Sequence, residues 1–318
     1  MFNIFDELKN CKSVAISAHE RPDGDAVGSC LGLCLYLKKR MPNAKICVFL
    51  DKPANCFADL PGFEYIDYMR DSDDVYDAFV MLDTSDERLG DSFKYYEKAS
   101  LIINIDHHIS NENGCGAFNY IVPSASSTCE LVYDVMDKEF IDRDIASLIY
   151  LGIAHDTGVF RFSNTSPKTM DIISRLLSYN FDFSSMLDKT FYEKSFAANK
   201  ALGQVLISST LYFEGKLIIG TITREIMDDC GANKDDLDGI VNQLMATAGV
   251  EVGVFIYPKK ENTIKVSLRA SSDLVNVSSV AARLGGGGHV RASGFDYVGS
   301  YEDAIQELIK YIGEQIVN

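Results

Sequence analysis

Aspartate and histidine side chains gather at four places in the first half of this sequence. These clusters are His19-Glu20-Arg21-Pro22-Asp23-Gly24-Asp25, Asp83, Asp106-His107-His108 and Asp156. Four of the five histidines lie in or beside them, and the fifth, His289, follows a run of glycines. Asp and His ligands without cysteine suit Mn²⁺, Fe²⁺ or Zn²⁺, and shared carboxylates suggest two ions close together. The clusters therefore predict a two-metal site of the kind that hydrolyses phosphate esters.

Each cluster has a simpler interpretation when it is taken alone. The string from Pro22 to Asp25 is a common turn, whose two carboxylates can point toward neighbouring positions. Asp83 and Asp156 could each cap the segment that follows. The string from Asp106 to His108 is more specific, because two adjacent histidines behind an acid at a buried strand end are costly to place without a ligand. Together the four clusters favour metal binding.

The elements that must position these clusters follow from the hydrophobic pattern. Apolar runs typical of strands cover 12–18, 46–50, 77–82 and 101–105, and an apolar helical pattern covers 26–39. Strands that alternate with helices predict an α/β fold, with a parallel sheet covered by helices on both faces. His19, Asp83 and Asp106 each follow a strand, at the carboxyl edge where such sheets bind ligands. One shared site is therefore expected.

The pattern changes along the second half and predicts a second, smaller α/β domain. Helical patterns cover 126–137, 142–155, 167–178 and 183–192. After them, strand patterns cover 205–213, 216–223, 251–258 and 263–270, and helical patterns cover 224–230, 237–248, 277–284 and 301–317. The predicted ranges are a first domain over 1–190, a helical linker over 191–205 and a second domain over 206–318.

Composition narrows the functional classes. The net charge of −16 argues against a broad electrostatic grip on duplex DNA or long RNA, whereas a small anionic substrate held by metal ions is compatible with it. Eight cysteines without CxxC spacing favour reduced thiols over disulfides or a zinc ribbon. The sequence shows no export signal and no run of 18 apolar residues, so we expect a cytoplasmic protein without a membrane span.

The order of the clusters resembles the motifs of the DHH phosphoesterase superfamily, whose name is the Asp106-His107-His108 string. The second half is similar to the associated C-terminal domain of the nanoRNase/pAp phosphatase branch. The strings that carry this likeness are Ser267-Leu268-Arg269, Val275-Asn276-Val277, Gly285-Gly286-Gly287-Gly288-His289 and Arg291-Ala292-Ser293-Gly294. The resemblance covers nearly the whole chain. It implies a metal-binding catalytic domain and a substrate-binding domain, with the active site in the cleft between them.

The resemblance also implies a role for each cluster. The implied ligands of one ion are His19, Asp23 and Asp83, and those of a second are Asp25, Asp83, His107 and Asp156. Asp83 would bridge two ions, for which we expect Mn²⁺, while His108 would face the scissile phosphate and Asp106 would orient the histidines. The charges of the four aspartates support two ions without reference to the family, because four clustered acids without metal would repel one another.

The glycine run predicts a second anion site. Four glycines between an apolar helix and a His/Arg pair suit close backbone approach to a phosphate, although a flexible loop is the simpler alternative. The substrate contacts that we expect are Arg269, Gly286, Gly287, Gly288, His289 and Ser127. Ser127 could equally be a plain helix cap. His155 departs from the family's pattern, and its role stays open.

The predicted activity is that of a metal-dependent phosphoesterase. It would hydrolyse short oligoribonucleotides such as pApA to mononucleotides and 3'-phosphoadenosine 5'-phosphate (pAp) to AMP, without a covalent enzyme intermediate. The alternatives are a cyclic di-AMP phosphodiesterase of the same superfamily, a catalytically silent nucleotide-binding sensor, and a scaffold whose Asp/His clusters only hold the sheet together. A homodimer is compatible with these features, whereas a membrane or a long duplex is not an expected partner.

Overall fold

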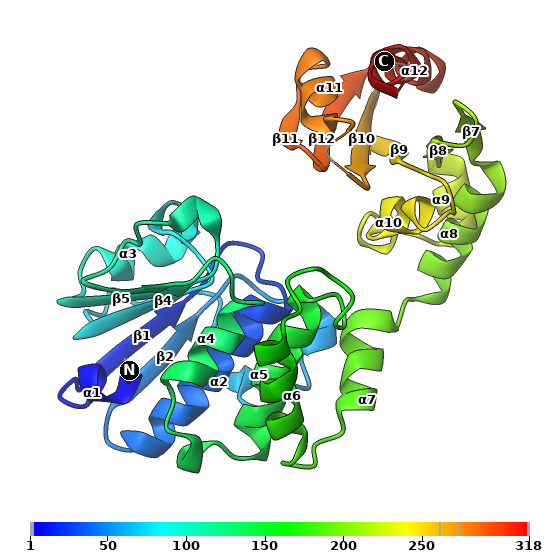
Figure 1. Cartoon of the computed structure of the whole chain (residues 1–318). Helices are drawn as coiled ribbons and strands as arrows, with labels where there is room; N and C mark the ends of the chain where they lie inside the picture. Colours follow the sequence, from blue (N-terminus) through cyan, green and yellow to red (C-terminus); the bar gives the residue numbers. More distant parts are fainter. Residues whose placement is uncertain (1–2, 261, 273, 317–318) are drawn as a thin grey trace. The chain divides into compact units, whose positions relative to one another are not determined.

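The computed structural model describes three stretches of the chain, residues 3–260, 262–272 and 274–316. The chain divides into two compact units, Met1–Glu193 and Lys194–Asn318, which we call the N-terminal and the C-terminal unit. Each unit is built around its own sheet, with helices packed against it (Figure 1). The predicted α/β fold class is confirmed.

The N-terminal unit is built on a parallel sheet with the strand order β3-β2-β1-β4-β5-β6. Its strands are β1 (Ser13–Ser17), β2 (Lys45–Phe49), β3 (Ile66–Asp67), β4 (Ala78–Leu82), β5 (Leu101–Asp106) and β6 (Phe118–Ile121). The chain moves outward from β1 in one direction through β2 and β3, and in the other through β4, β5 and β6. Ligands of open parallel sheets bind beyond the carboxyl ends of the strands, where this direction reverses. That point lies between β1 and β4.

Helices cover the sheet of the N-terminal unit unequally. Val80 of β4 faces a large core shared with the long helices, whereas Phe79 and Met81 face a smaller aromatic core that includes Tyr95. This alternation is expected of a strand that is buried on both faces. The helices are α1 (Ile4–Leu8), α2 (Gly24–Arg40), α3 (Phe93–Tyr96), α4 (Thr128–Val135), α5 (Arg143–Asp156), α6 (Pro167–Leu177) and α7 (Phe183–Leu187), followed by a π-helical turn, Asp188–Tyr192.

The C-terminal unit contains a mixed sheet with the order β11-β12-β10-β9-β8-β7. Its strands are β7 (Thr210–Tyr212), β8 (Leu217–Thr221), β9 (Val252–Lys260), β10 (Thr263–Ala270), β11 (Gly287–His289) and β12 (Ala292–Val298). Its helices are α8 (Phe196–Ser208), α9 (Arg224–Cys230), α10 (Ile240–Met245), α11 (Val277–Arg283) and α12 (Tyr301–Ile316). Helices α11 and α12 share one core with the sheet, and α8, α9 and α10 share the other.

One expectation for the second half of the chain is wrong, and one alternative is only partly right. The strand predicted over 205–213 is shorter, because α8 continues to Ser208 and only Thr210–Tyr212 pairs with β8. A short apolar run fits a helix as well as a strand, and here Val205 packs inside the core as part of the helix. The glycine run is not wholly a loop, since Gly287–His289 pairs antiparallel with β12.

The ranges 1–190, 191–205 and 206–318 stay a prediction. Helix α8, which overlaps the region expected to be a linker, places Ala201 and Val205 in the core of the C-terminal unit. Helix α8 is therefore part of the C-terminal unit.

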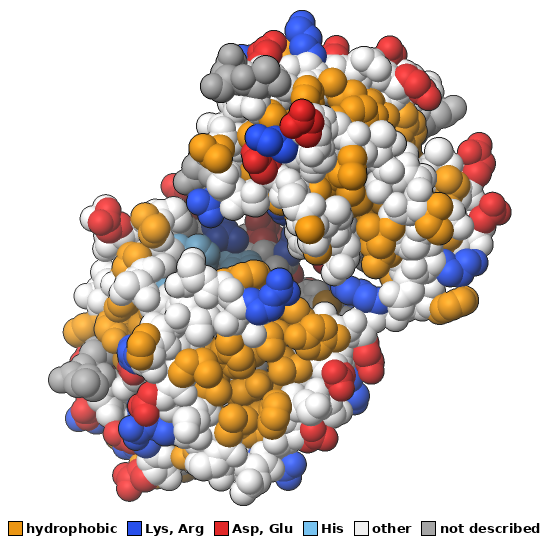
Figure 2. All heavy atoms as spheres, turned by 45° about the vertical axis from the view of Figure 1, so that its right-hand side comes forward, with side chains coloured by type: hydrophobic (Ala, Val, Ile, Leu, Met, Phe, Trp, Pro, Cys, Tyr) orange, Lys and Arg blue, Asp and Glu red, His pale blue; other side chains and the backbone are white. Residues whose placement is uncertain are grey.

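The surface mixes charges of both signs. Figure 2 shows acidic and basic side chains interspersed on the visible face, and apolar side chains gathered on the N-terminal unit around α5, α6 and α7. Phe183 at the start of α7 and Phe162 in the segment between α5 and α6 are exposed aromatic side chains. Within the described residues, every helix is too short or too polar to cross a membrane.

The contact between α2 and α5 gives a stability prediction. A Cβ atom at Gly28 would lie 2.5 Å from the carbonyl oxygen of Leu148, whereas a Cβ at Gly203 in α8 would meet nothing within 4 Å. We expect Gly28→Ala to lower the free energy of unfolding by about 1–3 kcal/mol through overpacking. Gly203→Ala should raise it by about 0.5–1 kcal/mol, because alanine favours a helix interior. Urea denaturation of both variants measures this, and equal stabilities would contradict the close packing of these two helices.

Candidate metal centre

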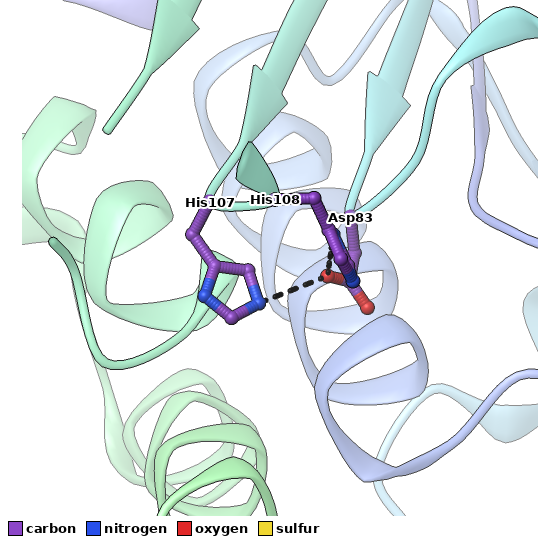
Figure 3. Close-up of side chains that lie close together, drawn as sticks. All are labelled: Asp83, His107 and His108. Atoms are coloured by element: carbon purple, nitrogen blue, oxygen red, sulfur yellow. Dashed lines mark ion pairs between the residues drawn. The ribbon is translucent and has the colours of Figure 1, made fainter. Parts of the chain in front are cut away.

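Asp83 lies at the centre of the Asp/His clusters. It follows β4 with a left-handed backbone (φ 57°), its amide donates to the carbonyl of Ile105 at 3.0 Å, and its side chain is almost fully buried. Figure 3 shows its carboxylate between His107 and His108. Its Oδ1 lies 3.5 Å from Nε2 of His107, and its Oδ2 lies 3.4 Å from Nε2 of His19. A single buried carboxylate therefore contacts imidazoles from two distant parts of the chain.

One group of side chains combines Asp83 with the loop after β1. His19, Asp23 and Asp83 offer ligand atoms that all lie within 4.8 Å of one another. Asp23 is the N-cap of α2 and accepts the amides of Asp25 and Ala26. Nδ1 of His19 lies 2.8 Å from the carbonyl oxygen of Glu20, which leaves Nε2 directed at the two carboxylates. A backbone carbonyl on one ring nitrogen is a common way to orient a metal-binding histidine.

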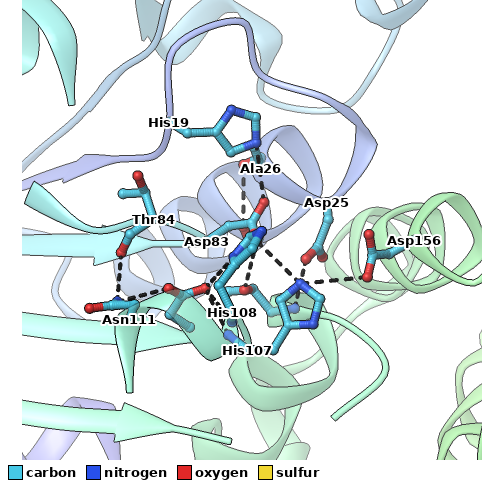
Figure 4. Close-up of polar contacts among 12 residues, drawn as sticks. His19, Asp25, Ala26, Asp83, Thr84, His107, His108, Asn111 and Asp156 are labelled. Carbon is cyan, nitrogen blue, oxygen red and sulfur yellow. Dashed lines mark hydrogen bonds and ion pairs between the residues drawn. The ribbon is translucent and has the colours of Figure 1, made fainter. Parts of the chain in front are cut away.

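A second group lies next to the first. Asp25, His107 and Asp156 also offer ligand atoms within 4.8 Å of one another, and Nε2 of His107 lies 3.5 Å from Oδ2 of Asp156 (Figure 4). Nδ1 of His107 faces the carbonyl oxygen of Ala125 at 3.4 Å, so that this ring also directs Nε2 at carboxylates. The structure thus brings together all six side chains expected to bind metal.

Asp25 is held by the start of another helix. Its two carboxylate oxygens accept the amides of Thr128 at 2.6 Å and Cys129 at 2.9 Å, which begin α4. Free amides at a helix N-terminus bind negative charge favourably. The hydroxyl of Thr128 donates to Oδ1 of Asp83 at 3.1 Å. The N-terminus of α4 therefore holds carboxylates from both groups.

Asp106 is fully buried and binds the two histidines that follow it. Its Oδ1 accepts the amides of His107 and His108 and also lies 2.8 Å from Nδ1 of His108, while its Oδ2 accepts Nδ2 of Asn111. A third group of neighbouring ligand atoms joins Asp83, His107 and His108. Because Nδ1 of His108 donates to Asp106, however, the free nitrogen of this ring is Nε2. His19 and His107 direct Nε2 at Asp83, whereas the Nε2 of His108 does not take part in these contacts.

Three buried polar residues, Asn104, Asn111 and Thr128, support the site, and the sequence pattern did not predict this role for any of them. Asn104 accepts a hydrogen bond from Asn111 at 2.8 Å, and both side chains donate to the carbonyl of Thr84, the residue after Asp83. Asn104 interrupts the apolar run LIINI, and a polar residue inside a buried strand is the one signal that could have drawn attention to it. The sequence gives no comparable signal for Asn111 or Thr128.

The electrostatics of the cluster reflect four carboxylates in one place. Burial together with the charges of Asp83 and Asp156 raises the pKa of Asp25 well above its ordinary value. Burial raises the pKa of Asp156 to about 6, although His107 opposes this shift. Burial also disfavours charge on Asp23, but hydrogen bonds from His19 and from backbone amides lower the pKa of this carboxyl to about 2. Such crowding of acids requires compensating positive charge.

In the protein without bound metal, the protonated histidines supply that positive charge. Burial would lower the pKa of His19, but its contacts with Asp23 and Asp83 raise this pKa to about 10. The pKa of His107 is likewise raised to about 10, against burial, by Asp83, Asp25 and Asp156. Carboxylate oxygens and imidazole nitrogens, arranged by buried hydrogen bonds, are the donor set that divalent transition metals accept. The residues therefore fit metal ions, which would take the place of the protons.

His155 lies beside this site. Its Nε2 is 3.0 Å from Oγ1 of Thr190, and burial lowers its pKa to about 4, so the ring is neutral. A Cβ atom at Gly24 would lie 2.3 Å from Cγ of His155. The imidazole thus occupies the space where a side chain at Gly24 would be.

The residues expected to contact the substrate have different surroundings. The hydroxyl of Ser127 is buried and caps α4 by accepting the amide of Glu130, and the predicted substrate contact stays a prediction. Arg269 lies on β10 and donates to the carbonyl of Leu268. His289 ends β11 at the edge of the C-terminal sheet, where it and Gly286, Gly287 and Gly288 are exposed.

Two of these glycines are required by packing. A Cβ at Gly286 would lie 2.3 Å from Cβ of Phe295, and one at Gly288, which has a positive φ, would lie 2.6 Å from the carbonyl oxygen of Ala292. A Cβ at Gly287 would meet nothing within 4 Å. Close approach to β12 therefore accounts for two glycines of the run, whereas there is space beside the Cα of Gly287, which pairs with Gly294 of β12.

A parallel sheet with an Asp/His cluster at its carboxyl edge defines an α/β protein with a candidate centre for divalent metal ions. The model of the DHH family, N-terminal domain, matches residues 13–153, and the model of the DHHA1 domain matches residues 214–318. The chain is 31% identical over 313 residues to a bifunctional oligoribonuclease and PAP phosphatase, NrnA, of Thermus thermophilus, covering 95% of this chain and 90% of that protein. The chain therefore belongs to the DHH family.

Further relatives agree with this assignment. The protein of the same name from Bacillus subtilis is 28% identical over 289 residues, covering 89% of this chain and 88% of that protein. The crystal structure of an exopolyphosphatase-related protein from Bacteroides fragilis superimposes with a TM-score of 0.87 at 26% identity, covering 97% of this chain and 94% of that chain. The likeness thus extends over both units.

The raised histidine pKa values give a prediction about metal binding and pH. Because His19 and His107 hold protons up to about pH 10 in the metal-free chain, and the pKa of Asp25 is raised as well, Mn²⁺ binding at pH 7 should release at least about two protons. The apparent affinity for Mn²⁺ should therefore rise as the pH is raised from 7 toward 10. Isothermal titration calorimetry in buffers of different ionisation enthalpy measures the protons released. His19→Gln should release about one proton fewer, and binding without proton release would contradict the protonated state.

Proposed function

We propose that this chain is a metal-dependent phosphoesterase that hydrolyses short oligoribonucleotides to mononucleotides and pAp to AMP. The observation that carries the proposal is the convergence of two Asp/His groups on Asp83. The substrate class rests on full-length likeness to proteins named bifunctional oligoribonuclease and PAP phosphatase. A chain that retains all six expected ligands is a better candidate for turnover than for a silent sensor.

Two ions, which we propose to be Mn²⁺, would be held on either side of Asp83. One would use His19, Asp23 and Asp83, and the other would use Asp25, Asp83, His107 and Asp156. When bound, such ions lower the pKa of a water molecule and neutralise charge that develops on phosphate oxygens. The four carboxylates would balance two divalent charges and leave a nearly neutral site for an anionic substrate.

His108 would act on the phosphate itself. Asp106 accepts the Nδ1–H of this ring and both neighbouring amides, so the imidazole is fixed in orientation and its Nε2 stays free. The side chain is about one third exposed, unlike His19 and His107. The hydrogen bond with Asp106 raises the pKa of His108, and the imidazolium form, protonated on both nitrogens, can donate a proton or a hydrogen bond from Nε2 to a phosphate oxygen. Asp106, itself held by Asn111, would keep the ring protonated at Nδ1.

The C-terminal unit would bind the end of the substrate that does not react. Arg269 and His289 offer a guanidinium and an imidazole that suit phosphate or base recognition. The absence of a side chain at Gly287, where a Cβ would meet nothing within 4 Å, would let an anion approach closely. Ser127 would contribute only if the start of α4 rearranged, because the residue is fully buried in the structure.

A substrate panel tests the proposed activity. The protein, supplied with Mn²⁺, is incubated with pAp, pApA, RNAs of about two to five nucleotides and cyclic di-AMP, and the products are separated by chromatography. We expect turnover of pAp and of the shortest linear RNAs. Preferred hydrolysis of cyclic di-AMP would favour the alternative phosphodiesterase activity. Tight binding without any product would identify a sensor and contradict the proposal.

Removing the shared carboxylate tests the centre. Asp83→Ala should lower kcat for pAp by at least about 100-fold, because it removes a ligand from both proposed metal positions. Asp171→Ala is a matched control, since that carboxylate is exposed on α6 and pairs only with Arg175 among the ion pairs observed. The control should keep kcat within about twofold. Equal activity of the two variants would show that Asp83 does not bridge.

A substitution in the C-terminal unit should act on binding instead. His289→Ala should raise KM for pApA about tenfold, the loss expected for one charged hydrogen bond, and change kcat little. Lys259→Ala, which removes an exposed partner of Asp296, is the control. Steady-state kinetics separates the two constants. A KM within about twofold of the unsubstituted protein would exclude His289 from substrate binding.

A further inference from the structure

His155 occupies a junction of four chain segments next to the metal centre. It is the penultimate residue of α5, directly before Asp156. Its ring lies against Gly24 at the start of α2. The ring centre is 5.7 Å from that of Phe57 and 5.3 Å from that of Phe191, the latter in the π-helical turn. Movement of any of these segments would therefore be transmitted to the imidazole.

The hydrogen bond to Thr190 fixes the orientation of this ring. The hydroxyl of Thr190 donates to the carbonyl oxygen of Met186 at 2.8 Å, so toward His155 it can only accept. Nε2 must then carry a proton, which it donates to Thr190 at 3.0 Å. Without the hydroxyl, this N–H would have no acceptor at that position. Thr190 thus determines both the tautomer and the rotation of the ring.

The contact with Gly24 explains how the ring can affect the metal centre. Gly24 has an ordinary helical backbone and lies between Asp23 and Asp25. A Cβ there would lie within 2.7 Å of three atoms of His155, so the glycine is required by the imidazole and not by the turn. Rotation of the ring would push on the backbone that positions both carboxylates. Asp156, next to His155, would shift with it.

The π-helical turn, Asp188–Tyr192, also contacts the imidazole of His155. It is the last element of the N-terminal unit, and the chain leaves that unit at Glu193. Two of its residues, Thr190 and Phe191, contact His155. Single π-helical turns are rare and are often found at functional sites. The segment that leads out of the N-terminal unit is therefore joined to the turn between Asp23 and Asp25 through one side chain.

We propose that His155 is a positioning residue for the metal centre, held in place by the hydroxyl of Thr190. It keeps Asp23, Asp25 and Asp156 in the arrangement that binds metal, and it links the position of the π-helical turn to that arrangement. The inference rests on the proposed metal-dependent function, because it assigns His155 a task only where these carboxylates bind cations.

Three variants test the proposal. Thr190→Val removes the hydroxyl at nearly constant shape, and Thr190→Ser restores it. Ser147→Ala is the matched control, because it removes a buried hydroxyl from α5 that donates to the carbonyl of Asp144 and is not part of the contacts around His155. Free Mn²⁺ is measured by electron paramagnetic resonance during titration of each protein. Hydrogen exchange of the metal-free proteins is measured over residues 19–31.

The two measurements give separate answers. Thr190→Val should weaken Mn²⁺ binding about tenfold, the lower end of the range for residues that orient metal ligands, and should speed exchange at the start of α2. Thr190→Ser and Ser147→Ala should each stay within about twofold of the unsubstituted protein. Unchanged affinity and exchange in Thr190→Val, or an equal loss in Ser147→Ala, would overturn the proposal. If the unsubstituted protein binds no Mn²⁺, the proposed function fails, and the exchange data alone decide whether Thr190 positions α2.

Discussion

The structure depends on holding four carboxylates of like charge together at one edge of a sheet. Asp25 and Asp83 are almost fully buried, and their charge is balanced in the chain by His19 and His107 and by amides at the start of α4. Because the imidazoles direct Nε2 at the carboxylates, the arrangement that relieves repulsion is also one that binds cations. The proposed chemistry follows from this single electrostatic constraint.

The fold meets that constraint through rigid elements. Strands β1, β4 and β5 are adjacent and parallel, so the residues that follow them meet at one edge. The starts of α2 and α4 add amides that bind negative charge. Buried polar side chains then fix the histidines, with Asp106 and Asn111 acting on His108 and backbone carbonyls acting on the other two rings. The loops that carry the histidines are thus held by buried hydrogen bonds, which suits a centre that must hold two ions at fixed positions.

Much of this arrangement could be predicted from the sequence, because the informative residues immediately follow strong apolar runs. The apolar runs before His19, Asp83 and His107 predict the strands that the structure contains, and the parallel order of these strands brings the clusters together. The two-residue strand β3 and the half-exposed β6 lack a hydrophobic pattern, so the sequence does not predict them. The roles of Asn111, Thr128 and Thr190 depend on contacts between distant segments, which no local pattern encodes. The glycine run was expected to approach an anion, but packing against β12 accounts for two of its members.

The central claim is that Asp83 is shared by two metal ions. The most direct measurement is an anomalous difference map from crystals grown with Mn²⁺ and recorded near the manganese absorption edge. The account predicts two peaks that both contact the carboxylate of Asp83, one beside His19 and Asp23 and the other beside Asp25, His107 and Asp156. A single peak, or two peaks of which one does not contact Asp83, would contradict it.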